Sequence, residues 1–277
     1  MDLTNPTQIK DLLERHNFHF SKTFGQNFLI TRQIPEKIAD SAQIDENTTV
    51  LEIGPGIGCL TRCLAARAKK VVTVEIDDRL IPILAETLAD LDNVQVVHND
   101  ILKTDLPALF AGEEKLAVCA NLPYNITTPI LVYLMESGLK FDSVTVMVQK
   151  EVAQRFCAEK GSKDYGAITL FLNYYTKPKM LFSVAAGNFL PKPRVDSAVL
   201  RLQAIDPPVD TDPEELFRII RGAFSMRRKT LQNTLASIGI PKETTAAALQ
   251  TLNLAPTARG EELGLKEYAA LVKELNR

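Results

Sequence analysis

The chain has 277 residues, of which 45% are hydrophobic and 24% are charged, and its formal net charge is −2. This length and composition are typical of a globular protein with one large domain, or with a large and a small one. The sequence contains no apolar run long enough to span a bilayer and no basic, apolar leader, so we expect a cytoplasmic protein. Because the charge balance is slightly acidic, a nucleic-acid partner would have to bind a local cluster of basic residues.

The cysteines do not form a metal-binding pattern. Cys59 and Cys63 lie four residues apart on a predicted helix, but no second pair and no nearby histidine completes a site. Cys119 and Cys157 are isolated in the sequence. We therefore expect reduced thiols and no metal centre.

The N-terminal region combines a helix, an irregular segment and a second helix. Pro6 suits the first position of a helix, and Asn5 suits its N-cap. Residues 21–29 follow neither a helical nor a strand period and contain two phenylalanines. A long loop with aromatic anchors is often functional, although a simple linker held down by its phenylalanines fits the same pattern. The second helix is predicted over 32–42.

From residue 49 onward, apolar strands alternate with helices. The predicted strands cover residues 49–53, 70–74, 94–97, 116–120 and 143–148, and the helices between them include 78–88 and 127–136. This alternation predicts successive βαβ units and an α/β fold with a doubly wound, Rossmann-like, mostly parallel sheet. Two later strands, over 179–184 and 197–202, have no helix between them, which predicts an antiparallel edge.

The C-terminal part is predominantly helical. Helices are predicted over 151–158, 167–175, 213–224, 228–237, 242–252 and 265–275. The segment Asp206-Pro207-Pro208 is typical of a linker. We therefore expect a sheet domain over residues 1–205 and a small helical domain over residues 206–277.

Three successive strands end in residues that suit a nucleoside ligand. Gly54, Gly56 and Gly58 follow the first strand, where glycines allow a close backbone approach and the next helix offers free N–H groups. Glu75 ends the second strand about 20 residues later, where a carboxylate can accept hydrogen bonds from ribose hydroxyls. Asp100 follows the third strand and can meet an adenine amine. In a sheet of order 3-2-1-4-5, these ends share one edge near the point where the strand order reverses.

The spacing of the glycines distinguishes two possible cofactors. Dinucleotide-binding enzymes use G-x-G-x-x-G, but position 59 is a cysteine, so the third glycine of that pattern is missing. A pyrophosphate needs that crowded turn, whereas the amino-acid tail of S-adenosylmethionine (SAM) does not. The sequence therefore favours SAM over a nicotinamide dinucleotide.

The fourth strand ends in Asn121-Leu122-Pro123-Tyr124. The Asn121 side-chain oxygen and the Leu122 carbonyl are two acceptors that can converge on an exocyclic amine. Pro123 stiffens this turn because its ring fixes φ, and Tyr124 offers a flat face on which a base can stack. An ordinary strand-to-helix turn would show the same four residues, but the neighbouring nucleoside site favours a clamp for an aromatic amine.

Several stretches together match a known family. They cover residues 22–29, 51–58, 121–126, 165–166, 189–197 and 223–231. With them the chain resembles the ribosomal RNA adenine dimethyltransferases, the family of the kasugamycin-resistance enzyme. The resemblance implies methyl transfer from SAM to N6 of two adjacent adenosines in a hairpin near the 3′ end of small-subunit (16S) rRNA, during biogenesis of the 30S ribosomal subunit. It also implies SAM contacts from Asn27, Leu29, Gly54, Glu75, Asp100 and Asn121.

The resemblance leaves two alternatives open. The erythromycin-resistance methyltransferases act on large-subunit rRNA and share the catalytic half of the family. A ribosome-assembly factor that binds RNA without catalysis could also keep this fold. We expect an enzyme, because Glu75, Asp100 and Asn121 are all present.

The predicted substrate contacts fall in two groups. Asn121, Leu122, Pro123 and Tyr124 are expected to hold the target adenine, with Phe189 against its second face; core packing is the alternative role of Phe189. We expect basic side chains to contact the rRNA phosphates, namely Lys22, Lys192, Arg194, Arg221, Arg227, Arg228 and Lys229. We expect the protein to act as a monomer.

Overall fold

The computed structural model describes residues 1–21, 25–226 and 228–276, and the chain forms two compact units. The first unit contains Met1–Ala153 and Lys179–Ala204, and the second contains Gln154–Pro178 and Ile205–Arg277. We predicted a single break after residue 205, but the segment Gln154–Pro178 also belongs to the second unit. The reason is aromatic packing within that unit, where the Phe171 and Tyr174 rings lie 5.0 and 5.2 Å from the Phe217 ring.

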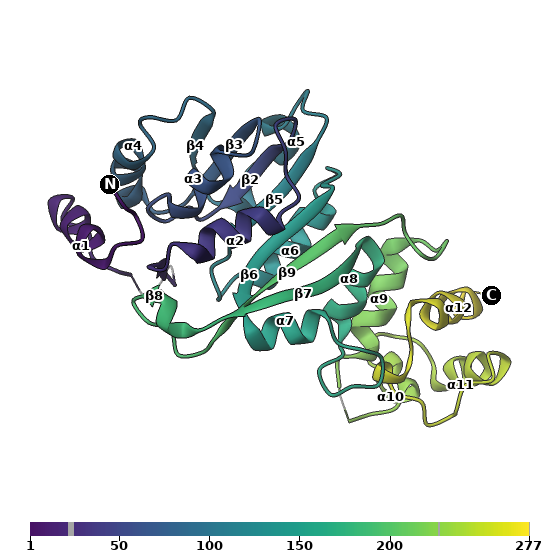
Figure 1. The fold of residues 1–277 in the computed structure, drawn as a ribbon. Coiled ribbons are helices and arrows are strands. Elements are labelled where there is room, and N and C mark those ends of the chain that lie inside the picture. Colours follow the sequence, from purple (N-terminus) through teal and green to yellow (C-terminus); the bar gives the residue numbers. More distant parts are fainter. Residues whose placement is uncertain (22–24, 227, 277) are drawn as a thin grey trace. The chain divides into compact units, whose positions relative to one another are not determined.

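The main sheet has the predicted α/β topology. In the described part of the chain its strand order is β4-β3-β2-β5-β6-β9-β7 (Figure 1). The strands are β2 (Thr49–Ile53), β3 (Lys70–Glu75), β4 (Val94–His98), β5 (Leu116–Asn121), β6 (Ser143–Gln149), β7 (Thr176–Val184) and β9 (Ser197–Ala204). The first five strands in this order, β4, β3, β2, β5 and β6, are parallel to one another, and β9 is antiparallel to β6. The predicted doubly wound sheet with an antiparallel strand is therefore confirmed.

The central strands are buried along almost their whole length. Every residue of β2 is buried, and only the last residue of β5 and of β6 is partly exposed. Continuous apolar runs of this kind are expected where helices cover both faces of a parallel sheet. One core cluster joins Val50 and Val71 to Leu64 on α3 (Cys59–Ala65), and also contains Cys119 and Met147.

The helices of the first unit mostly follow the sequence prediction. They are α1 (Pro6–Arg15), α2 (Gln33–Ser41), α3, α4 (Ile81–Thr87), α5 (Leu106–Leu109), α6 (Thr127–Glu136) and the start of α7 (Lys150–Phe156). Asn5 caps α1 as predicted, since its Oδ1 accepts hydrogen bonds from Thr7 N and Gln8 N. The short helix α5 was not predicted, and a 3-10 turn at Asp78–Leu80 replaces the first turn of the expected helix 78–88.

A second, two-stranded sheet fixes the segment that follows α1. Strand β1 (Phe28–Leu29) pairs antiparallel with β8 (Phe189–Leu190), with Leu29 opposite Phe189. The Ile30 N–H extends this pairing by donating to the Asn188 carbonyl at 2.9 Å. Our sequence analysis placed both segments in loops, because two residues are too few to show a strand period.

The second unit is helical. It contains the last three residues of α7, then α8 (Ala167–Tyr175), α9 (Pro213–Ala223), α10 (Leu231–Ala236), α11 (Lys242–Thr251) and α12 (Leu265–Leu275). Helix α10 begins three residues later than predicted. A turn precedes it, in which Lys229 N donates to Met226 O at 2.9 Å.

The described ranges contain neither a membrane-spanning helix nor a metal-binding cluster. No helix there has both the length and the apolarity needed to cross a membrane. No group of three or more histidine, cysteine, aspartate or glutamate side chains there is arranged to hold a metal ion.

Candidate active site

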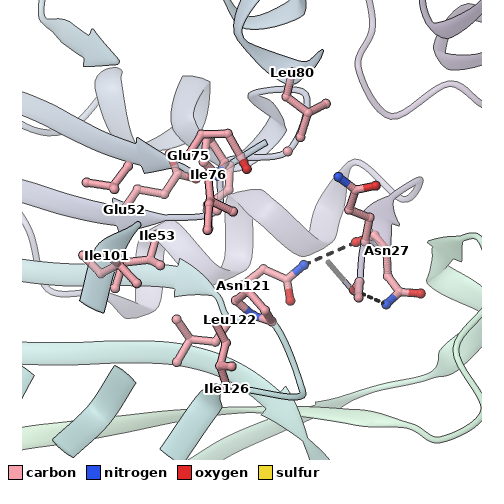
Figure 2. A pocket seen from close by; sticks show the side chains of 18 of the residues that line it. Asn27, Glu52, Ile53, Glu75, Ile76, Leu80, Ile101, Asn121, Leu122 and Ile126 are labelled. Carbon is pink, nitrogen blue, oxygen red and sulfur yellow. Dashed lines mark hydrogen bonds between the residues drawn. The ribbon is translucent and has the colours of Figure 1, made fainter. Parts of the chain in front are cut away.

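A cavity of about 310 Å³ lies where the strands β2, β3 and β5 end. Its walls come from segments far apart in the sequence, as Figure 2 shows for the labelled side chains. The predicted SAM-binding residues all line it, namely Asn27, Leu29, Gly54, Gly56, Glu75, Asp100 and Asn121. Leu122, Pro123 and Tyr124 line it as well. The size is within the range of small-molecule sites, which is about 300–1,000 Å³.

The glycine turn after β2 forms one wall without side chains. Gly54 and Gly56 have φ angles of +67° and +59°, which non-glycine residues rarely adopt. A Cβ atom on Gly56 would lie 3.1 Å from the Phe28 ring. The turn therefore needs glycine both for its conformation and for its contact with β1.

The N-terminal segment that carries Asn27 is held against the sheet edge by a polar contact. Gln26 Nε2 donates to Asp77 Oδ2 at 2.6 Å. Asp77 is only 1% exposed, and Arg79 pairs with the same oxygen at 2.6 Å. Together with the β1–β8 pairing, this contact fixes the Asn27 backbone above the cavity.

The Asn121 amide is oriented by that backbone. Its Nδ2 donates to the Asn27 carbonyl at 3.4 Å (Figure 2). A carbonyl can only accept, so this contact turns the amide nitrogen toward Asn27 and the amide oxygen away from it. Asn121 Oδ1 is buried and has no hydrogen-bond partner among the described residues. Because a buried acceptor without a partner is costly, this oxygen is a candidate acceptor for a ligand donor.

The next residues hold the turn rigid. Leu122 N donates to Met147 O at 3.1 Å, which continues the β5–β6 ladder. The Pro123 carbonyl accepts hydrogen bonds from Ile126 N and from Thr127 Oγ1. In contrast, no hydrogen bond from the described residues reaches the Leu122 carbonyl. Among the described residues, the turn thus has two acceptors without a hydrogen-bond partner, on Asn121 and Leu122.

Tyr124 lines the cavity and is anchored at its far end. Its hydroxyl forms a 2.6 Å hydrogen bond with Ser197 Oγ. Burial raises the pKa of Tyr124, so the phenol stays neutral at physiological pH. The hydroxyl end of this cavity-lining residue is therefore fixed to β9.

Two carboxylates, Glu75 and Asp100, also line the cavity. Glu75 is 5% exposed, and its Oε1 accepts a hydrogen bond from Asp77 N at 2.8 Å. Burial raises the pKa of Glu75 to about 7. Asp100 is more accessible, and its Oδ1 accepts from Leu102 N at 3.0 Å. Both side chains are hydrogen-bond acceptors that a ribose and an amine could satisfy.

Glu52 is a buried carboxyl group that the sequence analysis did not single out. It lines the cavity beneath the glycine turn, is 1% exposed, and accepts a 2.6 Å hydrogen bond from Thr61 Oγ1 of α3. Burial raises the pKa of Glu52 to about 8. At neutral pH this group is therefore mostly protonated, and it ties the end of β2 to α3 as a neutral acid.

The raised pKa predicts how stability depends on pH. The folded protein keeps the Glu52 proton up to about pH 8, whereas an unfolded glutamate releases it near 4.5. Between these two values the folded state holds one more proton than the unfolded state. The contribution of Glu52 to the free energy of unfolding is therefore fully present below pH 4.5, and it falls by about 1.4 kcal/mol per pH unit as pH rises toward 8. We expect Glu52→Gln to flatten this slope in urea unfolding between pH 5.5 and 8, and exposed Glu46→Gln to leave it unchanged. Equal slopes in all three proteins would contradict a buried, protonated Glu52.

Comparison with known proteins identifies the family. The family model described as ribosomal RNA adenine dimethylase matches residues 17–277. The chain belongs to the ribosomal RNA adenine dimethylase family. Ribosomal RNA small subunit methyltransferase A of Clostridium perfringens is 44% identical over 281 residues, which cover 100% of this chain and 99% of that protein.

Solved structures agree with this dimethylase assignment. A dimethyladenosine transferase from Plasmodium falciparum is 28% identical with a TM-score of 0.76, over 90% of this chain and 97% of that one. The 23S rRNA methyltransferase ErmE is 29% identical with a TM-score of 0.69, over 91% and 100% of the two chains. Both likenesses confirm the Rossmann-like methyltransferase fold.

The dimethylase structure does not support the predicted stacking role of Phe189. Phe189 is 2% exposed and is not among the described residues that line the cavity. Its ring belongs to the same core cluster as Leu29 and Val199, and its backbone pairs with β1. Strand β8 is short, but it lies against the core and turns this side chain inward. The alternative role, core packing, is the one that the structure shows.

The predicted RNA-binding residues of the dimethylase are exposed where the structure describes them. Lys192 and Arg194 lie on the loop before β9. In the second unit, Arg221 lies near the end of α9, and Arg228 and Lys229 lie in the turn before α10. Lys22 and Arg227 lie outside the described residues.

Sequence reasoning missed the residues that position the cavity walls. Gln26 and Ser197 lay in the stretches that carried the family resemblance, but their partners, Asp77 and Tyr124, are distant in the sequence. Glu52 was visible as an acidic residue inside an apolar strand, which is a recognisable signal for a buried functional carboxyl.

Proposed function

We propose that this dimethylase transfers methyl groups from SAM to N6 of two adjacent adenosines in a hairpin near the 3′ end of small-subunit rRNA. Each target would become N6,N6-dimethyladenosine during assembly of the small ribosomal subunit. The observation that carries the proposal is the unpartnered, buried Asn121 Oδ1 beside a nucleoside-sized cavity. We propose that it acts on this substrate in the cytoplasm, as a monomer.

The cavity residues fit SAM as the methyl donor. The glycine turn allows close approach of the amino-acid tail, Glu75 suits the ribose hydroxyls, and Asp100 suits the adenine amine of the cofactor. Asn27 and Leu29 would close the cavity from the N-terminal segment. When bound, SAM supplies an activated methyl group that needs no covalent nucleophile from the protein.

The turn after β5 fits the target adenine. The adenine N6 is a poor nucleophile because its lone pair is delocalised into the ring. Hydrogen bonds from N6–H to Asn121 Oδ1 and the Leu122 carbonyl would favour a more tetrahedral nitrogen with a freer lone pair. Tyr124 would stack on the base, which must leave its RNA stack to enter the cavity. The residues thus act mainly by alignment, and the released proton can pass to solvent.

Transfer of tritiated methyl groups from SAM to undermethylated small ribosomal subunits tests the proposal. We expect the label to appear as N6,N6-dimethyladenosine after nuclease digestion. RNA binding without transfer would instead support a non-catalytic assembly factor.

The likeness to ErmE favours a second candidate, a large-subunit rRNA target. Supplying large ribosomal subunits in the same assay distinguishes the two targets, because only the true target accepts label. The small-subunit target has the stronger support, because the relative at 44% identity over the whole chain is a small-subunit methyltransferase, whereas ErmE is 29% identical.

The pKa of Glu75 predicts a pH-dependent cofactor affinity. An ionised carboxylate accepts ribose hydrogen bonds better than a protonated one, and Glu75 ionises near pH 7. Affinity for S-adenosylhomocysteine should therefore rise from pH 6 to pH 8. Glu75→Gln should weaken binding about 10- to 100-fold at pH 8 and remove the pH dependence, as measured by calorimetry. An unchanged pH profile in Glu75→Gln would show that another group causes it.

A further inference from the structure

The Tyr124–Ser197 hydrogen bond has no part in the function described so far. Ser197 is fully buried and begins β9, where its backbone pairs with Gln149 of β6. Its hydroxyl is therefore fixed by the sheet. The 2.6 Å contact holds the hydroxyl end of the Tyr124 side chain, and Tyr124 is one of the residues that line the cavity.

A tyrosine ring that is fixed at its hydroxyl keeps one orientation. Without the hydrogen bond, the ring can tilt about its two side-chain torsions, and stacking on a base depends on parallel faces. The ring orientation thus depends on a residue that does not itself line the cavity. In the proposed function, Asn121 and Leu122 would restrain the amine edge of the base, whereas Tyr124 would restrain its plane.

The two methyl transfers depend differently on these restraints. Unmodified N6 carries two hydrogens, one for Asn121 Oδ1 and one for the Leu122 carbonyl. After the first transfer N6 keeps one hydrogen, so only one of these acceptors can be satisfied by the amine. The second transfer therefore relies more heavily on stacking against Tyr124.

We propose that Ser197 is a positioning residue that holds the Tyr124 ring in its stacking orientation and thereby favours completion of the second methylation. The proposal rests on the proposed function, and it deepens it by assigning separate roles to the amine acceptors and to the anchored ring. The bond that matters is a single hydrogen bond between two hydroxyl groups, so either residue can be altered to remove it.

The test compares the variants Ser197→Ala and Tyr124→Phe. Each should slow both transfers and the second more than the first, so that the ratio of N6-methyladenosine to N6,N6-dimethyladenosine rises about 2- to 10-fold. Mass spectrometry of nucleosides from methylated small subunits measures this ratio. The double variant should match the single ones, since both remove the same hydrogen bond. Tyr124→Phe keeps the proposal testable if Ser197→Ala folds poorly.

Ser143→Ala is the matched control. Ser143 is a buried serine at the opposite end of β6, and its Oγ donates to Ala42 O at 3.0 Å. This variant loses a buried serine hydrogen bond far from the cavity, so it should lower stability without changing the ratio. A general loss of stability cannot then be mistaken for a loss of positioning.

A second readout needs no methyl transfer. The fluorescence of a hairpin RNA with 2-aminopurine at the target position should be quenched when this base stacks on Tyr124. Because 2-aminopurine has no 6-amino group, the signal reports stacking without the hydrogen bonds to Asn121 and Leu122. We expect less quenching at saturating protein with Ser197→Ala and Tyr124→Phe, and wild-type quenching with Ser143→Ala. If both test variants showed wild-type quenching and an unchanged methylation ratio, the positioning role of Ser197 would be wrong, but the proposed function would stand. Failure of the wild-type protein to methylate small subunits would instead overturn the proposed function.

Discussion

Asn121→Ala should lose methyl transfer by about 10²- to 10³-fold, the loss typical when one positioned catalytic hydrogen-bonding group is removed. The variant deletes the buried Oδ1 acceptor and, with Nδ2, the contact to the Asn27 carbonyl. RNA binding should survive, because the exposed basic residues are untouched. Single-turnover transfer to small subunits, with RNA affinity measured in parallel, gives both quantities.

Asn188→Ala is a suitable control for this substitution. Asn188 is a partly exposed asparagine of the same unit, it does not line the cavity, and its Nδ2 donates to a nearby backbone carbonyl. Transfer by this variant should stay at the wild-type rate. If Asn121→Ala also kept the wild-type rate, the clamp after β5 would have no catalytic role.

Charge reversal in the turn before α10 should weaken RNA binding. Arg228 and Lys229 are exposed, and phosphate contacts from such side chains release counterions from the RNA. In Arg228→Glu/Lys229→Glu, affinity should fall, and the slope of log affinity against log salt should decrease by about 1 for each lost contact. The slope distinguishes loss of phosphate contacts from a general loss of folded protein.

Lys242→Glu/Lys273→Glu makes the same change in net charge at other exposed positions of the same unit. This variant should keep the wild-type salt slope, because its lysines lie outside the predicted RNA-binding cluster. An equal effect in both double variants would mean that overall charge governs binding. An unchanged affinity in Arg228→Glu/Lys229→Glu would assign the helical unit another role.

The parts of the fold that could be predicted are those that local sequence determines. Buried strands such as β2 and β5 are continuous apolar runs, and the residues after them lie at one sheet edge because parallel strands end together. The cavity-lining positions of Gly54, Glu75, Asp100 and Asn121 follow from this rule alone. Their contacts with SAM remain predictions that the binding experiments test.

Features that depend on distant partners could not be predicted. Strands β1 and β8 contain two residues each, so they show no period, and only their pairing makes them strands. The burial of Phe189 follows from that pairing, and a loop aromatic gives no sign of it in the sequence. The Gln26–Asp77 contact joins residues 51 positions apart. Sequence reasoning therefore located the chemistry but not the contacts that hold it in place.

Primer extension on rRNA from cells with and without this protein tests the central proposal most directly, since two methyl groups on N6 block base pairing and stop reverse transcription. We predict stops at two adjacent adenosines near the 3′ end of small-subunit rRNA. These stops should disappear when the gene is deleted, return with the wild-type protein, and stay absent with Asn121→Ala. Stops that persist after deletion, or that depend on the protein only in large-subunit rRNA, would contradict the account.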